Sequence, residues 1–150
     1  MQAQPKVGSL FVHSKENRAY KIKISRNLFL EDNPIPIEQL PDDVLLGWIG
    51  HELGHIQDYI ERGSMNLLGF GIKYYLSNSF VTKAEIAADS YAVAHGLGEK
   101  IIATKNFVLN HDQIPLAYKQ KIEALYLSPG EILSMVNPEL GEENNTLEEE

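Results

Sequence analysis

The chain of 150 residues contains no cysteine. Disulfides, thiolate zinc sites and cysteine nucleophiles are therefore excluded, and any bound metal must be held by His, Asp or Glu. The sequence also lacks a signal peptide and an apolar run long enough to span a membrane. The opening Met1–Pro5 is equally compatible with a leader that has been removed, so the compartment stays unassigned.

Positive charge is scarce. The chain has 13 Lys and Arg against 21 Asp and Glu, a formal charge of −8. Six of the glutamates lie in 137–150, and removing them leaves −2 for the remainder. A nucleic-acid partner is not expected, because no basic surface is available for its phosphates.

The composition predicts one domain followed by a tail. Hydrophobic residues make up 43% of the chain, as in an ordinary globular protein, and 150 residues suit a single core. Residues 137–150 are mainly Glu, Asn, Gly and Thr, which cannot bury enough apolar surface to fold. We expect a single domain over 1–136 and a disordered acidic tail over 137–150.

The string His51-Glu52-Leu53-Gly54-His55 is the most informative stretch of the sequence. Two histidines four positions apart in a helix lie on one face, so both imidazoles can reach one metal ion. Glu52, beside the first histidine, is placed to contact a metal-bound water as the general base. This is the His-Glu-x-x-His pattern of zinc hydrolases.

This string lies in a predicted helix over about 42–62. Pro41 and two acidic residues favour its start, and Gly63 its end. Three glycines inside it, Gly47, Gly50 and Gly54, each cost about 1 kcal/mol of helix propensity. We expect a central, buried helix whose glycines admit the close approach of a neighbour.

A second helix is predicted over about 82–95. Thr82 and Glu85 form a capping-box pattern at its start, and Gly96 follows its end. Glu85 and Asp89 share one face of this helix. Its small side chains would let it approach the glycine-bearing face of the first helix.

The third metal ligand must come from another part of the chain. The candidates are Glu85, Asp89, His95 and His111. Glu85 is the best placed of these, although the capping box gives its carboxylate a competing role at the helix start. Asp89, one turn on, would then accept the second ring N–H of a ligand histidine.

Peptide hydrolysis also needs a group that stabilises the oxyanion besides the metal. Tyr91, His95 and His111 are candidates for this role, as are other tyrosines, and the sequence does not choose among them.

The remaining segments predict a small sheet and further helices. Alternation over 19–25 indicates an edge strand, along which an extended peptide could lie. Residues 1–18 read as an extended entry with a short strand at 10–12, and 33–36 as a loop. Further helices are expected over about 99–109, 115–127 and 129–136. The apolar segment 64–79 should pack on the core, with a membrane-surface or lid role less favoured.

The two motifs together resemble the gluzincin metallopeptidases. That clan carries His-Glu-x-x-His on one helix and Glu-x-x-x-Asp on a second, here Glu85-Ile86-Ala87-Ala88-Asp89. The resemblance covers about 19–96 and is closest to minimal single-domain members. It implies an α+β, zincin-like fold with a short sheet and a mainly helical body. It also implies Zn²⁺ ligands at His51, His55 and Glu85, a base at Glu52, and support from Asp89.

The expected function is therefore a zinc-dependent endopeptidase that hydrolyses peptide bonds through a metal-activated water. The alternative is a non-catalytic zinc-binding regulatory or interaction domain on a similar scaffold. The expected partner is a peptide or protein substrate, a membrane surface is less favoured, and the oligomeric state is not determined by the sequence.

Overall fold

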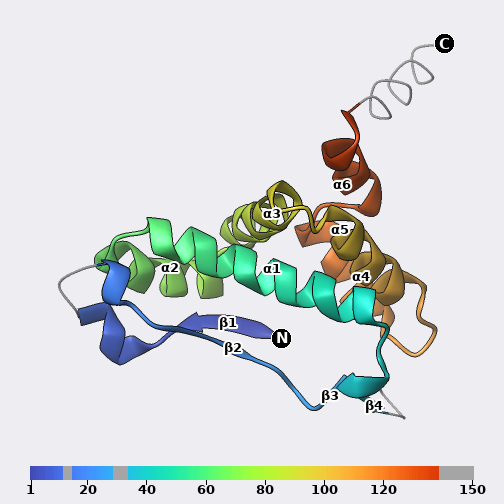
Figure 1. The fold of residues 1–150 in the computed structure, drawn as a ribbon, viewed down its shortest axis with the longest axis horizontal. Coiled ribbons are helices and arrows are strands. Elements are labelled where there is room, and N and C mark those ends of the chain that lie inside the picture. The colour runs from blue at the N-terminus through green and yellow to red at the C-terminus, as the bar shows by residue number, and fades with distance from the viewer. Residues whose placement is uncertain (12–14, 29–33, 139–150) are drawn as a thin grey trace.

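Helix α1, Asp42–Glu61, is the element against which much of the chain packs. The computed structural model describes residues 1–11, 15–28 and 34–138. Helices α3 and α4 and strand β1 all contact α1 (Figure 1). The predicted helix over about 42–62 is confirmed to within one residue at its end, with Asp42 and Asp43 in its first turn.

Five further α-helices follow in the described residues. They are α2 (Ser64–Leu76), α3 (Asn78–Ala94), α4 (Gly98–Asn110), α5 (Leu116–Leu125) and α6 (Pro129–Val136). Short 3₁₀ turns occur at Val7–Phe11, Lys15–Asn17 and Ile37–Gln39. A capping box opens α6, where Ser128 and Glu131 bond each other's backbone N–H.

Two small antiparallel sheets complete the fold, so the general α+β class is confirmed. Strand β1 (Gln2–Pro5) pairs with β2 (Tyr20–Lys23), and β3 (Asn27–Leu28) pairs with β4 (Ile35–Pro36). The alternation of half-buried and exposed residues in β2 matches the predicted strand, although the strand is shorter than 19–25.

Two expectations for the N-terminal region are wrong, and a third is refined. Residues 2–5 are extended, as expected, and they form a strand whose backbone is paired with β2. Leu10 and Phe11 lie in a 3₁₀ turn and not in a strand, and Val12 lies outside the described residues. Ile35–Pro36 pairs as β4, so the expected loop is a strand there.

The start of α3 also differs from the prediction. The helix begins at Asn78, where the Ser77 hydroxyl accepts a hydrogen bond from the N–H of Phe80. Thr82 instead donates to the carbonyl of Asn78 inside the helix. Glu85 therefore lies well within α3, and the capping-box interpretation of Thr82 and Glu85 is wrong. This leaves the carboxylate of Glu85 free to face α1.

The glycines of α1 are sites of close approach, as predicted. A Cβ built on Gly54 would lie 2.1 Å from the carbonyl oxygen of Ala88 in α3. A Cβ on Gly47 would lie 2.1 Å from the carbonyl oxygen of Lys100 in α4. Both neighbours are backbone atoms, which cannot give way as a flexible side chain would. The glycines therefore set how closely α3 and α4 lie against α1.

Several apolar side chains remain exposed. Leu53 on α1 is 49% exposed, so this helix is buried on one side only. On α2, Leu67 and Phe70 are buried while Met65 is 81% exposed. Leu116, the first residue of α5, is also exposed.

No helix in the described ranges combines the length and hydropathy needed to cross a bilayer. The predicted disordered tail falls, from residue 139 on, outside the described residues.

Gly54→Ala should destabilise the protein, because the new methyl group meets the backbone of Ala88 and forces α1 and α3 apart. Overpacking of this kind costs roughly 1–3 kcal/mol. Urea unfolding followed by circular dichroism measures it. Gly69→Ala in α2 is the matched control: nothing lies within 4 Å of its built Cβ, and stability should rise by about 0.4–1 kcal/mol. Equal effects of the two substitutions would contradict the packing argument.

Candidate metal centre

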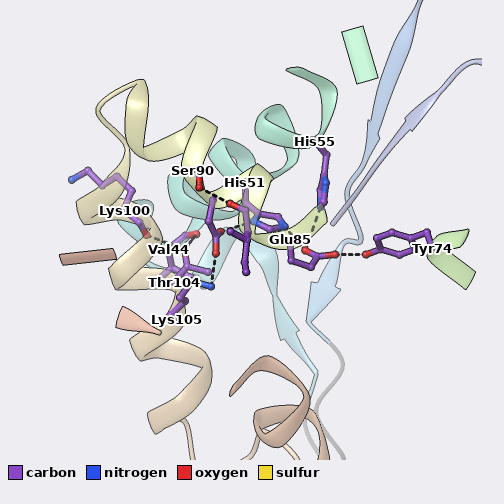
Figure 2. A network of polar contacts seen from close by, with 11 residues as sticks. Val44, His51, His55, Tyr74, Glu85, Ser90, Lys100, Thr104 and Lys105 are labelled. Atoms are coloured by element: carbon purple, nitrogen blue, oxygen red, sulfur yellow. Dashed lines mark hydrogen bonds and ion pairs between the residues drawn. The ribbon is translucent and has the colours of Figure 1, made fainter. Parts of the chain in front are cut away.

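Two histidines of α1 and one glutamate of α3 meet at a single point. The Nε2 atom of His51 lies 2.9 Å from Oε2 of Glu85, and Nε2 of His55 lies 3.3 Å from the same oxygen. The ligand atoms of the three residues all lie within 4.8 Å of one another. Figure 2 shows the Glu85 carboxylate between Tyr74 and the histidines. This group can hold a metal ion.

A second carboxylate orients the first histidine. Oδ1 of Asp89 lies 2.8 Å from Nδ1 of His51, so the ring N–H at Nδ1 donates to Asp89 and Nε2 faces Glu85. Asp89 is fully buried, as expected for a residue one turn from Glu85 on the face toward α1.

A buried lysine neutralises Asp89. Nζ of Lys105 in α4 lies 2.9 Å from Oδ2 of Asp89, and the lysine is only 5% exposed. A carboxylate buried without a counter-ion would be strongly unfavourable. Lys105 thus extends the polar network from α3 into α4.

The other oxygen of Glu85 is held by α2. The hydroxyl of Tyr74 donates a hydrogen bond to Oε1 of Glu85. With the histidines on Oε2, both oxygens of this carboxylate are bonded, which fixes its orientation toward α1. Figure 2 shows this tyrosine approaching from the side opposite His51.

The contacts within this network shift the pKa values of His51 and Glu85. Burial alone would lower the pKa of His51, but the carboxylates of Asp89 and Glu85 outweigh it and raise that pKa to about 9. Burial alone would raise the pKa of Glu85, but the bonds from His51 and His55 hold it well below its usual range. The metal-free cluster therefore pairs an imidazolium with a carboxylate, and a bound cation would take the place of that proton.

The donor set suits a divalent metal ion. Two imidazole nitrogens and one carboxylate oxygen leave a coordination position for water or substrate. In addition, Nδ1 of His55 is buried and has no hydrogen-bond partner in the described part of the chain. A bare ion pair between His51 and Glu85 gives no reason for a second buried imidazole at the same oxygen, whereas a metal site does.

Glu52 lies beside the cluster and is not part of it. Its side chain is 7% exposed, and it lines a cavity of about 390 Å³ together with His51, His55 and Glu85. Its Oε2 atom accepts a hydrogen bond of 2.5 Å from the backbone N–H of Ala3. The carboxylate is thus close to the candidate ligands, and one of its two oxygens is engaged by the backbone of Ala3.

The three candidates for the oxyanion role are not brought to this cavity. The Tyr91 hydroxyl donates to Glu61 at 2.7 Å, and Nδ1 of His95 lies 2.7 Å from the carbonyl of Tyr91. The ring of His111 packs on Phe107 at 5.1 Å. None of the three lines the cavity that contains Glu52.

Sequence reasoning missed three residues of the site: Tyr74, Lys105 and Tyr126. The ring of Tyr126 lies 5.7 Å from that of His51, and Tyr126 lines the same cavity. The two tyrosines carry no local signal. Lys105 does, because it occupies the buried stripe of α4 at helical spacing from Ile101 and Val108, where a lysine needs a partner.

Comparisons with protein-family models, with curated proteins and with solved structures found no match to this chain.

The protein should bind about one Zn²⁺ per chain, and substituting any ligand should reduce the affinity. We expect His51→Ala, His55→Ala and Glu85→Ala to abolish binding at micromolar zinc. Asp89→Asn should weaken it by roughly 10–100-fold, because Asp89 only orients a ligand. Titration against a chromogenic zinc chelator measures this. His95→Ala and His111→Ala serve as controls and should leave the affinity unchanged; a loss in either would place the metal elsewhere.

Lys105→Met should destabilise the metal-free protein by about 3–5 kcal/mol, because it leaves the carboxylate of Asp89 buried without its counter-ion. The matched control is Lys100→Met on the same helix, whose ion pair with Asp43 lies at the surface. That substitution should cost less than about 1 kcal/mol. Urea unfolding in the presence of a chelator compares the two, and similar values would show that burial of the Lys105 pair has no energetic weight.

Proposed function

We propose that this chain is a zinc-dependent endopeptidase of the gluzincin type. The observation that carries the proposal is the meeting of His51 Nε2, His55 Nε2 and Glu85 Oε2 at one wall of a cavity that Glu52 also lines. A metal ligand set and a separate carboxylate at the same cavity are the elements of a metal-dependent hydrolase.

Zinc is the metal that this donor set favours. Sulfur ligands are excluded by composition, and a His₂Glu set with one open position is a frequent form of catalytic zinc site. Magnesium and calcium prefer oxygen ligands throughout, which two imidazoles do not supply.

The residues divide the chemical work as follows. When bound, zinc lowers the pKa of its water to about 7 and polarises a carbonyl group. Glu52 takes the proton of the attacking water and returns it to the leaving amine. Asp89 keeps the proton of His51 on Nδ1, so that Nε2 presents its lone pair to the metal.

Tyr126 is the best-placed group for the oxyanion. It lines the cavity beside His51 and Glu52, which the earlier candidates Tyr91, His95 and His111 do not. Burial, and next the charge of Glu85, raise the pKa of its hydroxyl. The hydroxyl therefore keeps its proton at neutral pH and can donate it in a hydrogen bond.

A second candidate function is a non-catalytic, zinc-dependent binding domain on the same scaffold. One observation favours it: the carboxylate of Glu52 already accepts the N–H of Ala3. A base engaged by the chain's own backbone is not free to activate water. The hydrolysis assay with a chelator control separates the two functions, because both require zinc but only one consumes peptide.

Glu52→Gln should keep the zinc and lose the hydrolysis. The amide has nearly the shape of the carboxylate but cannot accept the proton of the attacking water, so the rate should fall by roughly 10²–10⁴-fold. A fluorogenic peptide library, read with and without a chelator, measures the rate, and metal analysis measures the zinc.

The matched control is Glu61→Gln, on the same helix but at its exposed end. This substitution should leave the rate at the parental value. Equal rates for Glu52→Gln and the parent would remove Glu52 from the role of base.

A further inference from the structure

Strand β1 contacts β2 and also α1, the helix that carries His51, Glu52 and His55. It pairs with β2 in the register Gln2 with Lys23, Ala3 with Ile22 and Gln4 with Lys21, and it also contacts α1 (Figure 1). In an antiparallel pair, alternate residues turn their N–H groups to opposite sides. The N–H of Ala3 points away from β2 and donates to Glu52.

The segment also forms one wall of the cavity that contains the metal cluster. Residues 1–5 line it from one side, and His51, Glu52, His55 and Glu85 line it from the other. Met1 additionally lines a second cavity of about 320 Å³ with apolar residues such as Trp48 and Val108. Met1 thus borders both cavities.

The contacts of β1 depend mostly on its backbone, so extended peptides of many different sequences could make them. They are a backbone ladder with β2, one backbone N–H on Glu52, and a small side chain, Ala3, buried in a cluster that includes Tyr59, Leu67 and Phe70. Backbone pairing of this kind is how peptides add to a sheet edge. A strand of four residues is held by few hydrogen bonds, so it can be displaced.

We propose that the edge of β2 above Glu52 is a binding site for an extended peptide, and that Gln2–Pro5 is its intramolecular occupant. The inference rests on the proposed function for the claim that the bound peptide is a substrate. A tethered segment acts at an effective concentration of about millimolar. A peptide in solution must overcome that competition, so the chain holds its own cleft closed.

The neighbouring charges define the class of peptide. Lys21 and Lys23 are exposed on β2, and their partners in β1 are the uncharged Gln4 and Gln2. Opposite charges directly across a ladder stabilise the pair, and like charges destabilise it. The site therefore favours a peptide with acidic residues on either side of a small one.

The first test uses a reversible lock in the full, zinc-loaded chain. Because the chain has no cysteine, Gln4→Cys with Lys21→Cys introduces a single pair across the ladder, at positions whose Cα atoms face each other. The probe is a fluorescein-labelled peptide with the sequence MEAEPK, followed by anisotropy. The oxidised protein should bind at least tenfold more weakly than the reduced protein. Equal binding in the two states overturns the proposal.

The second test displaces β1 without shortening the chain. Gln2→Pro with Gln4→Pro removes the two N–H groups that face β2. This variant should bind MEAEPK at least tenfold more tightly than the parent does. Gln2→Ala with Gln4→Ala keeps both N–H groups and should retain the closed cleft. If the circular dichroism spectrum of the proline variant differs from that of the parent, the proposal is judged by the cysteine-pair experiment alone.

Charge selectivity and hydrolysis are read in the same proteins. The open variant should bind MEAEPK about fivefold more tightly than MQAQPK, and MKAKPK more weakly than either; no difference among them overturns the charge assignment. Binding of peptide without any hydrolysis would contradict the endopeptidase proposal but not the proposal that Gln2–Pro5 occupies the peptide site. Equal hydrolysis by the oxidised and reduced proteins would contradict the occupancy of the site by Gln2–Pro5 but not the endopeptidase proposal.

Discussion

The close contact of α1 and α3 at Gly54 is the constraint on which the site depends. Only a residue without a side chain lets the backbone of Ala88 come this near, where a Cβ would lie 2.1 Å from its carbonyl oxygen. At that separation a carboxylate of α3 reaches two imidazoles of α1 directly. A wider spacing would leave Glu85 without its partners and the histidines without a third ligand.

The contact buries several ionisable groups together, and each of them is bonded to the next. Lys105 neutralises Asp89, Asp89 accepts from His51, and His51 and His55 share Glu85. Tyr74 completes the set from α2. Each group is buried because the next supplies its partner, so four helices are tied to one network. This is a stability cost that a purely structural core would avoid by using apolar residues.

The same geometry explains why the N-terminal strand matters. The short ladder of β1 and β2 stands beside α1, and the backbone of Ala3 completes the bonding of Glu52. In the proposed hydrolase, Gln2–Pro5 occupies the position of a substrate and is held there mainly through its backbone. The backbone ladder with β2 and the hydrogen bond to Glu52 would then serve both to close the cleft and to bind an extended peptide.

The sequence by itself determined the local features. The spacing of His51 and His55 and the acidic start and glycine end of α1 each depend on residues within one or two helical turns, and they were predicted because their causes are local. The partnership of Glu85 was open between a cap and a ligand. Tertiary structure excluded the cap, because α3 begins four residues before Thr82, and it placed the carboxylate beside both histidines. The roles of Lys105, Tyr74 and Ala3 depend on elements that are distant in sequence, whose positions only the packing around Gly54 fixes. The sequence around a residue does not indicate which distant residue it will contact. Lys105 is an exception, because a charged residue within a buried apolar stripe of a helix must have a partner of opposite charge.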